Sequence, residues 1–348
     1  MLKILVTGAA GLIGGEVCAR LAARGADVTA MVRKTREVRG NDGLPVAGIT
    51  IVSGDVTLPL MGLDPAALKP DLVIHCAASL EFDAPRDVLA AVNVEGTRNA
   101  VEFARASGAG FLHVSTAYVC GQREGTIAEG PVPASTRFTN NYEESKALAE
   151  EVVACSGVSF AIARPSIVLG DDATGAIREF PSLCNAFRLM ARGKIGVLPV
   201  AATSTLNLVP ISHVAEGIAR LAEQFAAAQG GYFHLVTQHP LPAAELARGV
   251  ARVEHLPSPV TVDPNQFDID SLQGAERMLL SRMLGTYGAY FRQEPRFEDD
   301  AFRALTGLEC PETDIAWLAR LIDYGVASGF LPAPCISERR DSAAQAAA

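Results

Sequence analysis

Short runs of apolar residues alternate with longer segments of helical spacing through the first half of the chain. The runs lie at residues 3–7, 27–33, 49–54, 71–77, 110–115 and 160–165. Residues 12–24 and 86–107 place apolar side chains three and four positions apart, and another helix is expected from about Tyr142. Because the runs are apolar throughout, both faces of each strand should be buried, as in a parallel sheet that helices cover. The alternation predicts an α/β fold.

The alternation becomes irregular after residue 169, although a strand at 205–210, a helix after it and a strand at 232–237 are still expected. We therefore predict a doubly wound parallel sheet of the Rossmann type with a smaller, mostly helical C-terminal cap that holds the substrate. The predicted units are a nucleotide-binding core at 1–169 completed by about 205–237, a cap at 170–204 and 238–330, and a disordered tail at 331–348.

Composition narrows the class of protein. Of the 348 residues, 49% are hydrophobic and 20% are charged, which is typical of a globular chain. The net charge of −9 disfavours nonspecific binding to nucleic acid, which needs a basic surface. Seven scattered cysteines without a CxxC pair predict neither a disulfide framework nor a metal site.

Two apolar stretches are not expected to enter a membrane. The first, MLKILVTGAAGLIGG, is interrupted by glycines, as in a strand, turn and helix rather than a signal peptide. The second, residues 195–215, lacks Asp, Glu, Lys and Arg but contains Pro199, Pro210 and several polar residues. We expect a soluble, cytoplasmic protein.

A glycine-rich turn follows the first expected strand. TGAAGLIGG places Gly8, Gly11 and Gly14 between that strand and a helix. Glycines allow backbone N–H groups to approach a pyrophosphate at a helix N-terminus, where the helix dipole favours negative charge. The lysine of a P-loop is absent, so the turn predicts a dinucleotide rather than ATP hydrolysis.

The end of the second strand indicates which dinucleotide binds. Enzymes that use NAD usually carry an acidic residue there, whereas this chain has Arg33, Lys34 and Arg36. A guanidinium offers a planar fork of donors to a 2′-phosphate, so we predict NADPH, with a solvated basic loop as the alternative. Asp55, after the third strand, is either placed to meet the adenine amine or a plain turn aspartate.

Tyr142 and Lys146 are the predicted acid–base pair. They are four residues apart on a helix and therefore share one face. A free tyrosine has a pKa near 10, and an ammonium group held nearby should lower it. Tyr118 has Gln122 at the corresponding spacing, so we expect it to line the pocket or to pack. The fifth strand delivers Ser115 and Thr116 to the carboxyl edge of the sheet, where α/β folds bind ligands.

These segments resemble the extended short-chain dehydrogenase/reductase superfamily over nearly the whole chain. The residues that carry the resemblance are TGAAGLIGG, NVEGTRN, VSTAYVCG, YEESK and ARPSIVLG. The resemblance implies that Thr116 supplies the active hydroxyl beside Tyr142 and Lys146, with Ser115 as a second choice. Asn93 matches an asparagine of the family, for which we prefer a structural role.

The resemblance also implies where the cofactor lies, because residues 165–167 fall where the family's strand-six loop packs on the nicotinamide. The complete set of residues predicted to bind NADPH is Gly8, Ala10, Gly11, Leu12, Ile13, Gly14, Arg33, Lys34, Asp55, Val56, Ala77, Ala78, Lys146, Pro165, Ser166 and Ile167.

One branch of the superfamily fits best. HVSTAYVCGQREGTIAE, ARPSIVLGDDATG and NLVPISHVAEGIARLA are similar to the fatty acyl-CoA reductases, whose branch includes the thioester reductase domains of carboxylic acid reductases and of peptide and polyketide synthetases. Cys120 stands where that branch usually has asparagine. The resemblance implies reduction of an acyl thioester to an aldehyde or an alcohol. We expect no carrier or adenylating domain ahead of the reductase, so that the acyl group would arrive on coenzyme A or a separate carrier protein.

Other functions stay open. An extended reductase or epimerase acting on a ketone, a hydroxysteroid-like compound or a sugar nucleotide would use the same three residues. A non-catalytic NADPH-binding regulator is a third possibility, whereas a hydrolase is disfavoured because GxSxG is absent. His75 and His113 are expected to be hydrogen-bonded core residues. Five apolar cap residues would either hold an acyl chain or form core: Ile177, Phe180, Leu183, Phe187 and Leu189.

Overall fold

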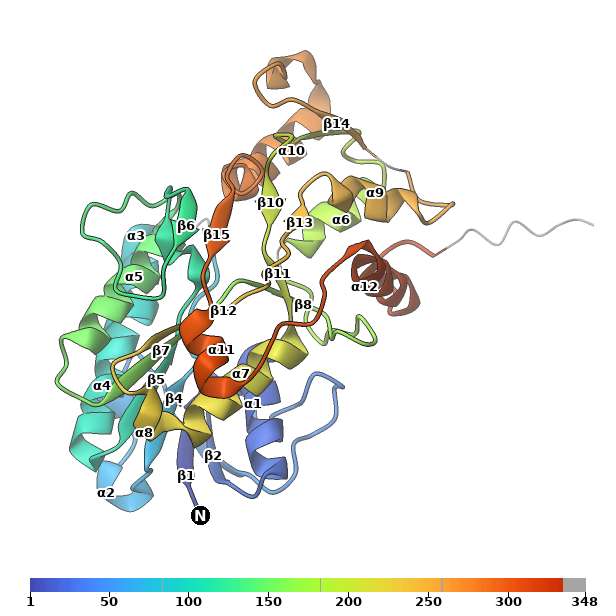
Figure 1. Ribbon diagram of the computed structural model, residues 1–348. Coiled ribbons are helices and arrows are strands. Elements are labelled where there is room, and N and C mark those ends of the chain that lie inside the picture. Colours follow the sequence, from blue (N-terminus) through green and yellow to red (C-terminus); the bar gives the residue numbers. More distant parts are fainter. Residues whose placement is uncertain (83, 182, 258, 334–348) are drawn as a thin grey trace, which may run out of the picture.

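A seven-stranded parallel sheet forms the centre of the protein, whose computed structural model describes residues 1–82, 84–181, 183–257 and 259–333. The strand order is β12-β7-β5-β4-β1-β2-β3 (Figure 1). The strands are β1 (Lys3–Thr7), β2 (Asp27–Val32), β3 (Thr50–Ser53), β4 (Leu72–His75), β5 (Gly110–Val114), β7 (Phe160–Pro165) and β12 (Tyr232–Leu235). The order reverses between β1 and β4, which is where open α/β sheets bind ligands at the carboxyl ends of the strands.

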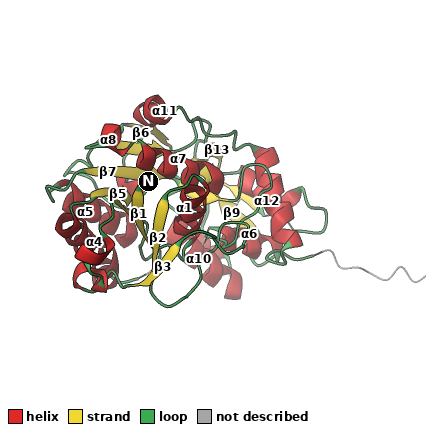
Figure 2. Cartoon of the chain, turned by 90° about the horizontal axis from the view of Figure 1, so that it is seen from below, coloured by secondary structure: helices red, strands yellow, loops and turns green. Residues whose placement is uncertain are grey.

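Helices cover both faces of this sheet (Figure 2). Ile4 and Val6 of β1 pack with α1 (Leu12–Ala23) and α7 (Ile211–Glu223), whereas Leu5 between them packs with α4 (Glu95–Ser107) on the opposite face. The second face is completed by α5 (Asn141–Ala154). The expected α/β fold with a doubly wound sheet is confirmed.

The later segments build a cap around a separate apolar cluster that contains the buried Trp317. Its helices are α6 (Cys184–Ala191), α9 (Glu245–Ala251), α10 (Gly274–Tyr287) and α12 (Ile315–Ala327). Short strands join in pairs, namely β8 (Ile167–Leu169) with β11 (Leu208–Pro210), β9 (Val197–Pro199) with β14 (Val260–Val262), β10 (Thr205–Leu206) with β13 (Leu241–Pro242), and β6 (Gly125–Ile127) with β15 (Pro295–Phe297).

The remaining elements are short. They are η1 (Pro59–Gly62), α2 (Pro65–Leu68), α3 (Arg86–Leu89), η2 (Ala90–Val94), η3 (Ala117–Cys120), α8 (Phe225–Ala228), η4 (Ile269–Ser271) and α11 (Asp300–Thr306). Among the described residues, no helix has the length and apolar character needed to cross a membrane. The tail expected at 331–348 lies outside the described residues, apart from 331–333.

Two expected elements are interrupted, each at an asparagine. The helix expected at 86–107 widens into the π-helical η2, where the Asn93 carbonyl accepts a 2.6 Å hydrogen bond from Thr97 Oγ1. The strand expected at 205–210 divides into β10 and β11 at Asn207, whose Nδ2 donates to the Thr237 carbonyl at 2.8 Å. In both cases a buried polar residue takes part in hydrogen bonds outside the regular pattern of the element, which the apolar spacing of its neighbours does not reveal.

The five apolar cap residues offered for an acyl chain belong to the cap's own core. Ile177, Leu183 and Phe187 are at most 3% exposed, and Phe180 and Leu189 pack against them. Of the two interpretations, the structure therefore favours core packing.

Candidate active site

The glycine-rich turn packs so closely against neighbouring backbone that two of its positions exclude a side chain. Gly8 has a φ of +64°, and a Cβ there would lie 2.6 Å from the Ala77 backbone nitrogen. A Cβ on Gly14 would lie 2.3 Å from the Gly8 carbonyl oxygen. Gly11 is the N-cap of α1 and provides no side-chain hydrogen bond, so the first N–H groups of the helix can donate to another partner. This backbone cradle suits a pyrophosphate at the N-terminus of α1.

Charged residues meet at the ends of β2 and β3. Asp55 Oδ1 accepts hydrogen bonds from the Thr57 backbone N–H at 2.9 Å and from the Thr57 hydroxyl at 2.8 Å. These bonds hold the pKa of Asp55 below its usual value, and the nearby charges of Arg33 and Lys34 lower it further. Three residues predicted to bind the cofactor are thus gathered at one corner, and Asp55 also forms a turn of its own.

The N-terminus of α5 positions Tyr142 and Lys146. Asn140 caps the helix by accepting a 2.9 Å hydrogen bond from the Glu143 N–H. Both predicted catalytic side chains are buried, Tyr142 being 8% and Lys146 2% exposed. The Tyr142 ring packs on Phe82, with 4.8 Å between the ring centroids.

The Lys146 ammonium is held by the end of β5. Its Nζ donates to the Val114 carbonyl at 2.9 Å and lies 3.3 Å from His113 Nε2. Burial lowers the pKa of Lys146 to about 8, although the charge of Glu150 opposes the shift. A substantial fraction of this lysine is therefore neutral at pH 8.

The phenol of Tyr142 differs from the sequence-based expectation. Burial raises its pKa above the ordinary value, and the neighbouring Glu143 carboxylate raises it further. The expected lowering by Lys146 is therefore wrong: burial and Glu143 both raise the pKa of Tyr142, and the Lys146 ammonium is bonded to Val114 and His113 instead. The phenol therefore stays protonated at neutral pH, which is the form required of an acid.

Two hydroxyls follow β5 and differ in how they are bonded. Thr116 Oγ1 accepts a 3.2 Å hydrogen bond from the Tyr118 N–H, which leaves the Thr116 hydroxyl proton free to be donated elsewhere. Ser115 Oγ is buried and has no hydrogen-bond partner among the described residues. Tyr118 packs edge-on against Tyr290 at 4.7 Å, in agreement with a packing role.

Neutral histidines lie beneath the ammonium of Lys146. His75 is bonded to the hydroxyls of Thr7 at 2.8 Å and Thr97 at 3.2 Å, and its ring stacks on His113 at 5.6 Å. Burial lowers the pKa of His75 to about 3 and that of His113 well below its usual value. Both are fully buried, as expected, and the uncharged His113 ring presents Nε2 as an acceptor to Lys146.

Asparagines organise the loops around the predicted nicotinamide position. Asn93 bonds the Ser79 backbone N–H at 2.7 Å and donates to Ser145 Oγ at 2.9 Å, which agrees with a structural role. Asn207, which sequence analysis did not single out, accepts a 2.7 Å hydrogen bond from the hydroxyl of Ser166. The only signal for Asn207 was a polar residue inside an otherwise apolar run.

Glu143 and Tyr290 form a link that sequence analysis also missed. Tyr290 follows α10 of the cap, and its hydroxyl donates to Glu143 Oε1 at 2.7 Å. The same carboxylate accepts the Thr139 N–H at 2.9 Å, so it joins the start of α5 to the cap. No motif marks this pair, because its members are 147 positions apart.

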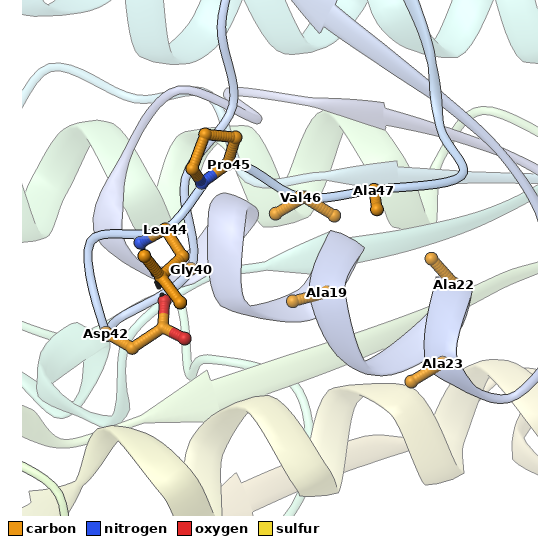
Figure 3. A pocket seen from close by; sticks show the side chains of 9 residues that line it. All are labelled: Ala19, Ala22, Ala23, Gly40, Asp42, Leu44, Pro45, Val46 and Ala47. Atoms are coloured by element: carbon orange, nitrogen blue, oxygen red, sulfur yellow. Dashed lines mark hydrogen bonds between the residues drawn. The ribbon is translucent and has the colours of Figure 1, made fainter.

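A surface groove of about 300 Å³ lies apart from these groups, between α1 and the loop at 40–47 (Figure 3). Its lining is Ala19, Ala22, Ala23, Gly40, Asp42, Leu44, Pro45, Val46 and Ala47. The helix faces the sheet with Val17, Cys18 and Leu21, so the groove opens on a different side of α1. Asp42 supplies the one polar side chain of this lining, so the groove offers no acid–base chemistry comparable with that at the end of β5. Among the described residues, no group of three or more His, Cys, Asp or Glu side chains is arranged for a metal ion.

Known proteins resemble the chain in family, in sequence and in structure. The family model described as male sterility protein matches residues 6–218. A 2-alkyl-3-oxoalkanoate reductase of Shewanella oneidensis is 27% identical over 276 residues, which is 74% of this chain and 67% of that protein. A linear gramicidin synthase of Brevibacillus parabrevis is 25% identical over 367 residues, covering 94% of this chain but 7% of the synthase chain.

Among solved structures, the terminal R domain from the myxalamid PKS-NRPS biosynthetic pathway is similar throughout. Its TM-score is 0.82 at 25% identity, and the match covers 96% of this chain and 93% of that one. The similarity therefore includes the cap as well as the sheet.

Proposed function

The chain belongs to the male sterility protein family of extended short-chain dehydrogenases/reductases, and from that premise we propose that this oxidoreductase uses NADPH to reduce an acyl thioester to an aldehyde. The observation that carries the proposal is the similarity to the R domain over 96% of the chain. The match with a linear gramicidin synthase points to the same kind of assembly. The acyl group would arrive on a carrier protein or on coenzyme A.

The proposed reaction requires a proton donor and a group that stabilises negative charge on oxygen. A bound NADPH supplies the hydride that the carbonyl carbon accepts. Thr116 and Tyr142 would donate hydrogen bonds to the developing oxyanion, and Tyr142 would transfer its proton to that oxygen. The resulting hemithioacetal then breaks its C–S bond. Its hydroxyl proton is lost as the carbonyl forms again, the sulfur takes up a proton and leaves as a thiol, and an aldehyde remains. One thioester, one hydride and one proton are consumed for each aldehyde and thiol.

Lys146, His75 and His113 would support this chemistry from beside Tyr142. The Lys146 ammonium is buried one helical turn from Tyr142, and the Val114 carbonyl and His113 fix its position. Because both histidines are neutral, they neither repel the ammonium nor compete for the proton.

The proposal assigns NADPH rather than NADH to the cofactor site. Arg33 and Lys34 are exposed at the end of β2, and Asp55 is the acidic group whose pKa reflects their charges. Two cations beside a single turn aspartate favour a 2′-phosphate at this corner. Residues 1–169 with 205–237 would then form the cofactor-binding core, and residues 170–204 and 238–330 the substrate cap.

A turnover assay with product identification tests this function. The purified protein is incubated with NADPH and a series of acyl-CoA thioesters, absorbance at the cofactor band is followed, and thiol and aldehyde are quantified. We expect equal amounts of oxidised cofactor, thiol and aldehyde. Consumption beyond one equivalent of cofactor for each thiol would indicate reduction to the alcohol.

A second candidate is reduction of a ketone, which the 27% identity to a 2-alkyl-3-oxoalkanoate reductase favours. A panel of 3-oxoacids and hydroxysteroid-like ketones is therefore run beside the thioesters. Turnover of ketones without any release of thiol would replace the thioester proposal by this one. Binding of NADPH without turnover of either class would leave a non-catalytic NADPH-binding protein.

A further inference from the structure

The loop between β8 and α6 reaches back from the cap to the glycine-rich turn. Arg178 in this loop donates from Nη2 to the Ala10 carbonyl oxygen at 3.1 Å. Ala10 lies in the turn that precedes α1, and Leu12 at the start of α1 packs against the cap cluster. A cation from the cap is therefore placed at the N-terminus of the helix expected to face a pyrophosphate.

Hydrogen bonds on both sides hold this loop in place. Asn41 accepts the Arg178 backbone N–H at 3.0 Å and donates from Nδ2 to the Ala176 carbonyl at 2.9 Å. On the cap side, Trp317 Nε1 donates to the Asp171 carbonyl at 3.3 Å. The position of Arg178 is thus determined by the fold rather than by its own side chain.

The guanidinium of Arg178 has donors to spare. Its side chain is 14% exposed, and its Nε is buried without a hydrogen-bond partner among the described residues. Its ion-pair partner is the adjacent Glu179 at 3.0 Å, whose side chain is 58% exposed. A guanidinium carries five N–H donors, and leaving one of them buried and unpaired is unfavourable. Both contacts of the guanidinium use Nη2, and Nη1 has no hydrogen-bond partner among the described residues, so donors remain for an anionic partner that the fold does not itself supply.

We propose that Arg178 binds the pyrophosphate of the dinucleotide, together with the backbone N–H groups of the glycine-rich turn. The assignment rests on the NAD(P)-binding domain and does not depend on which substrate is reduced. The pyrophosphate is preferred to the 2′-phosphate because Ala10 belongs to the turn, whereas Arg33 and Lys34 occupy the end of β2. Cofactor binding thereby involves the cap, and the loop carrying Arg178 joins the two parts.

The test is direct binding of NADPH and NADH, measured by isothermal titration calorimetry without substrate. Both dinucleotides contain the pyrophosphate, so Arg178→Gln should weaken both by the same factor, about ten- to a hundredfold for lost charge-assisted hydrogen bonds. Arg192→Gln is the matched control, because Arg192 is exposed at the C-terminal end of α6 and carries the same charge. The control should bind both cofactors as the wild type does.

Three results would overturn the proposal. They are unchanged affinity for both dinucleotides in Arg178→Gln, a loss confined to NADPH, and an equal loss in Arg192→Gln. Thermal unfolding of each variant verifies that it is folded. If Arg178→Gln does not fold, Arg178→Lys replaces it, because lysine keeps the positive charge but lacks the planar set of guanidinium donors. The lysine variant should bind both cofactors more weakly than the wild type and by one common factor, and wild-type affinity for both would refute the role of the fork.

Trp317 offers a second readout, because it is the chain's single tryptophan and bonds the same loop. Addition of NADPH should change its fluorescence in the wild type and in Arg192→Gln. The change should require a correspondingly higher NADPH concentration in Arg178→Gln. If the thioester proposal failed while this difference persisted, the role of Arg178 would stand.

Discussion

Replacement of Lys146 by methionine tests whether its burial costs stability, and how that cost depends on pH. The ordinary lysine pKa is 10.5, and the folded protein lowers it to about 8. Below pH 8 the lysine is charged in both the folded and the unfolded chain, so the folded state bears the full cost of burying an ammonium. Between pH 8 and 10.5 the unfolded chain binds more protons, and stability must therefore rise with pH. Above 10.5 the cost disappears.

The magnitude follows from the two pKa values. A difference of 2.5 units (10.5 less 8) corresponds to about 3 kcal/mol at pH 7, of which about 2 kcal/mol is relieved by pH 9.5. Lys146→Met removes this dependence, although it also leaves the Val114 carbonyl and His113 Nε2 without their donor. Those lost bonds do not change with pH in this range, so the difference between pH values isolates the ammonium.

The assay is urea unfolding of the wild type and Lys146→Met at pH 7.0 and 9.5. Relative to the variant, the wild type should gain about 2 kcal/mol in the free energy of unfolding between the two pH values. Lys194→Met is the control, since Lys194 is exposed and its replacement should follow the wild type at both pH values. If the free energy of unfolding of the wild type did not rise relative to that of Lys146→Met, or fell as the pH rose, the buried charge would be refuted.

Three further substitutions test the remaining assignments. Tyr142→Phe should lower kcat about 10²–10⁴-fold with little change in the Kd for NADPH. The control variant Tyr324→Phe, in the cap, should leave kcat unchanged. Near-normal turnover of Tyr142→Phe would remove the phenol from the mechanism. Arg33→Ala should raise the KM for NADPH about tenfold or more while changing that for NADH little, and equal effects on both would place Arg33 away from a 2′-phosphate. Tyr290→Phe should reduce the free energy of unfolding by about 2 kcal/mol, because the Glu143 carboxylate loses a buried donor. Urea unfolding at pH 7 measures this difference. Unchanged stability would mean that water replaces the hydroxyl.

The parts of the fold predicted most closely are those that local sequence determines. The strand expected at 160–165 is β7 (Phe160–Pro165), and that expected at 110–115 is β5 (Gly110–Val114), because continuous apolar runs bounded by glycine or proline admit little else. The pairing of β6 with β15 had no such signal. It joins residues about 170 positions apart, and each strand has three residues.

The candidate site shows the same division. Spacing alone brought Tyr142 and Lys146 to one face of a helix, and the position after a strand brought Thr116 to the sheet edge. Glu143 and Arg178 were not found, because each acts through a partner from a distant segment, Tyr290 and Ala10 respectively. Such contacts depend on how the cap lies on the core, and a helical or strand period carries no information about that placement.

The pKa of Tyr142 shows why spacing was insufficient for its chemistry as well. A lysine four residues away predicts a more acidic phenol, yet burial and the Glu143 carboxylate act in the opposite direction. The raised pKa of Tyr142 is compatible with the proposed direction of reaction. Reduction needs a protonated phenol to meet an oxyanion, whereas oxidation of an alcohol needs the phenolate as a base. A site that keeps Tyr142 protonated, with a lysine whose charge diminishes above pH 8, therefore suits reduction at neutral pH and opposes the reverse reaction.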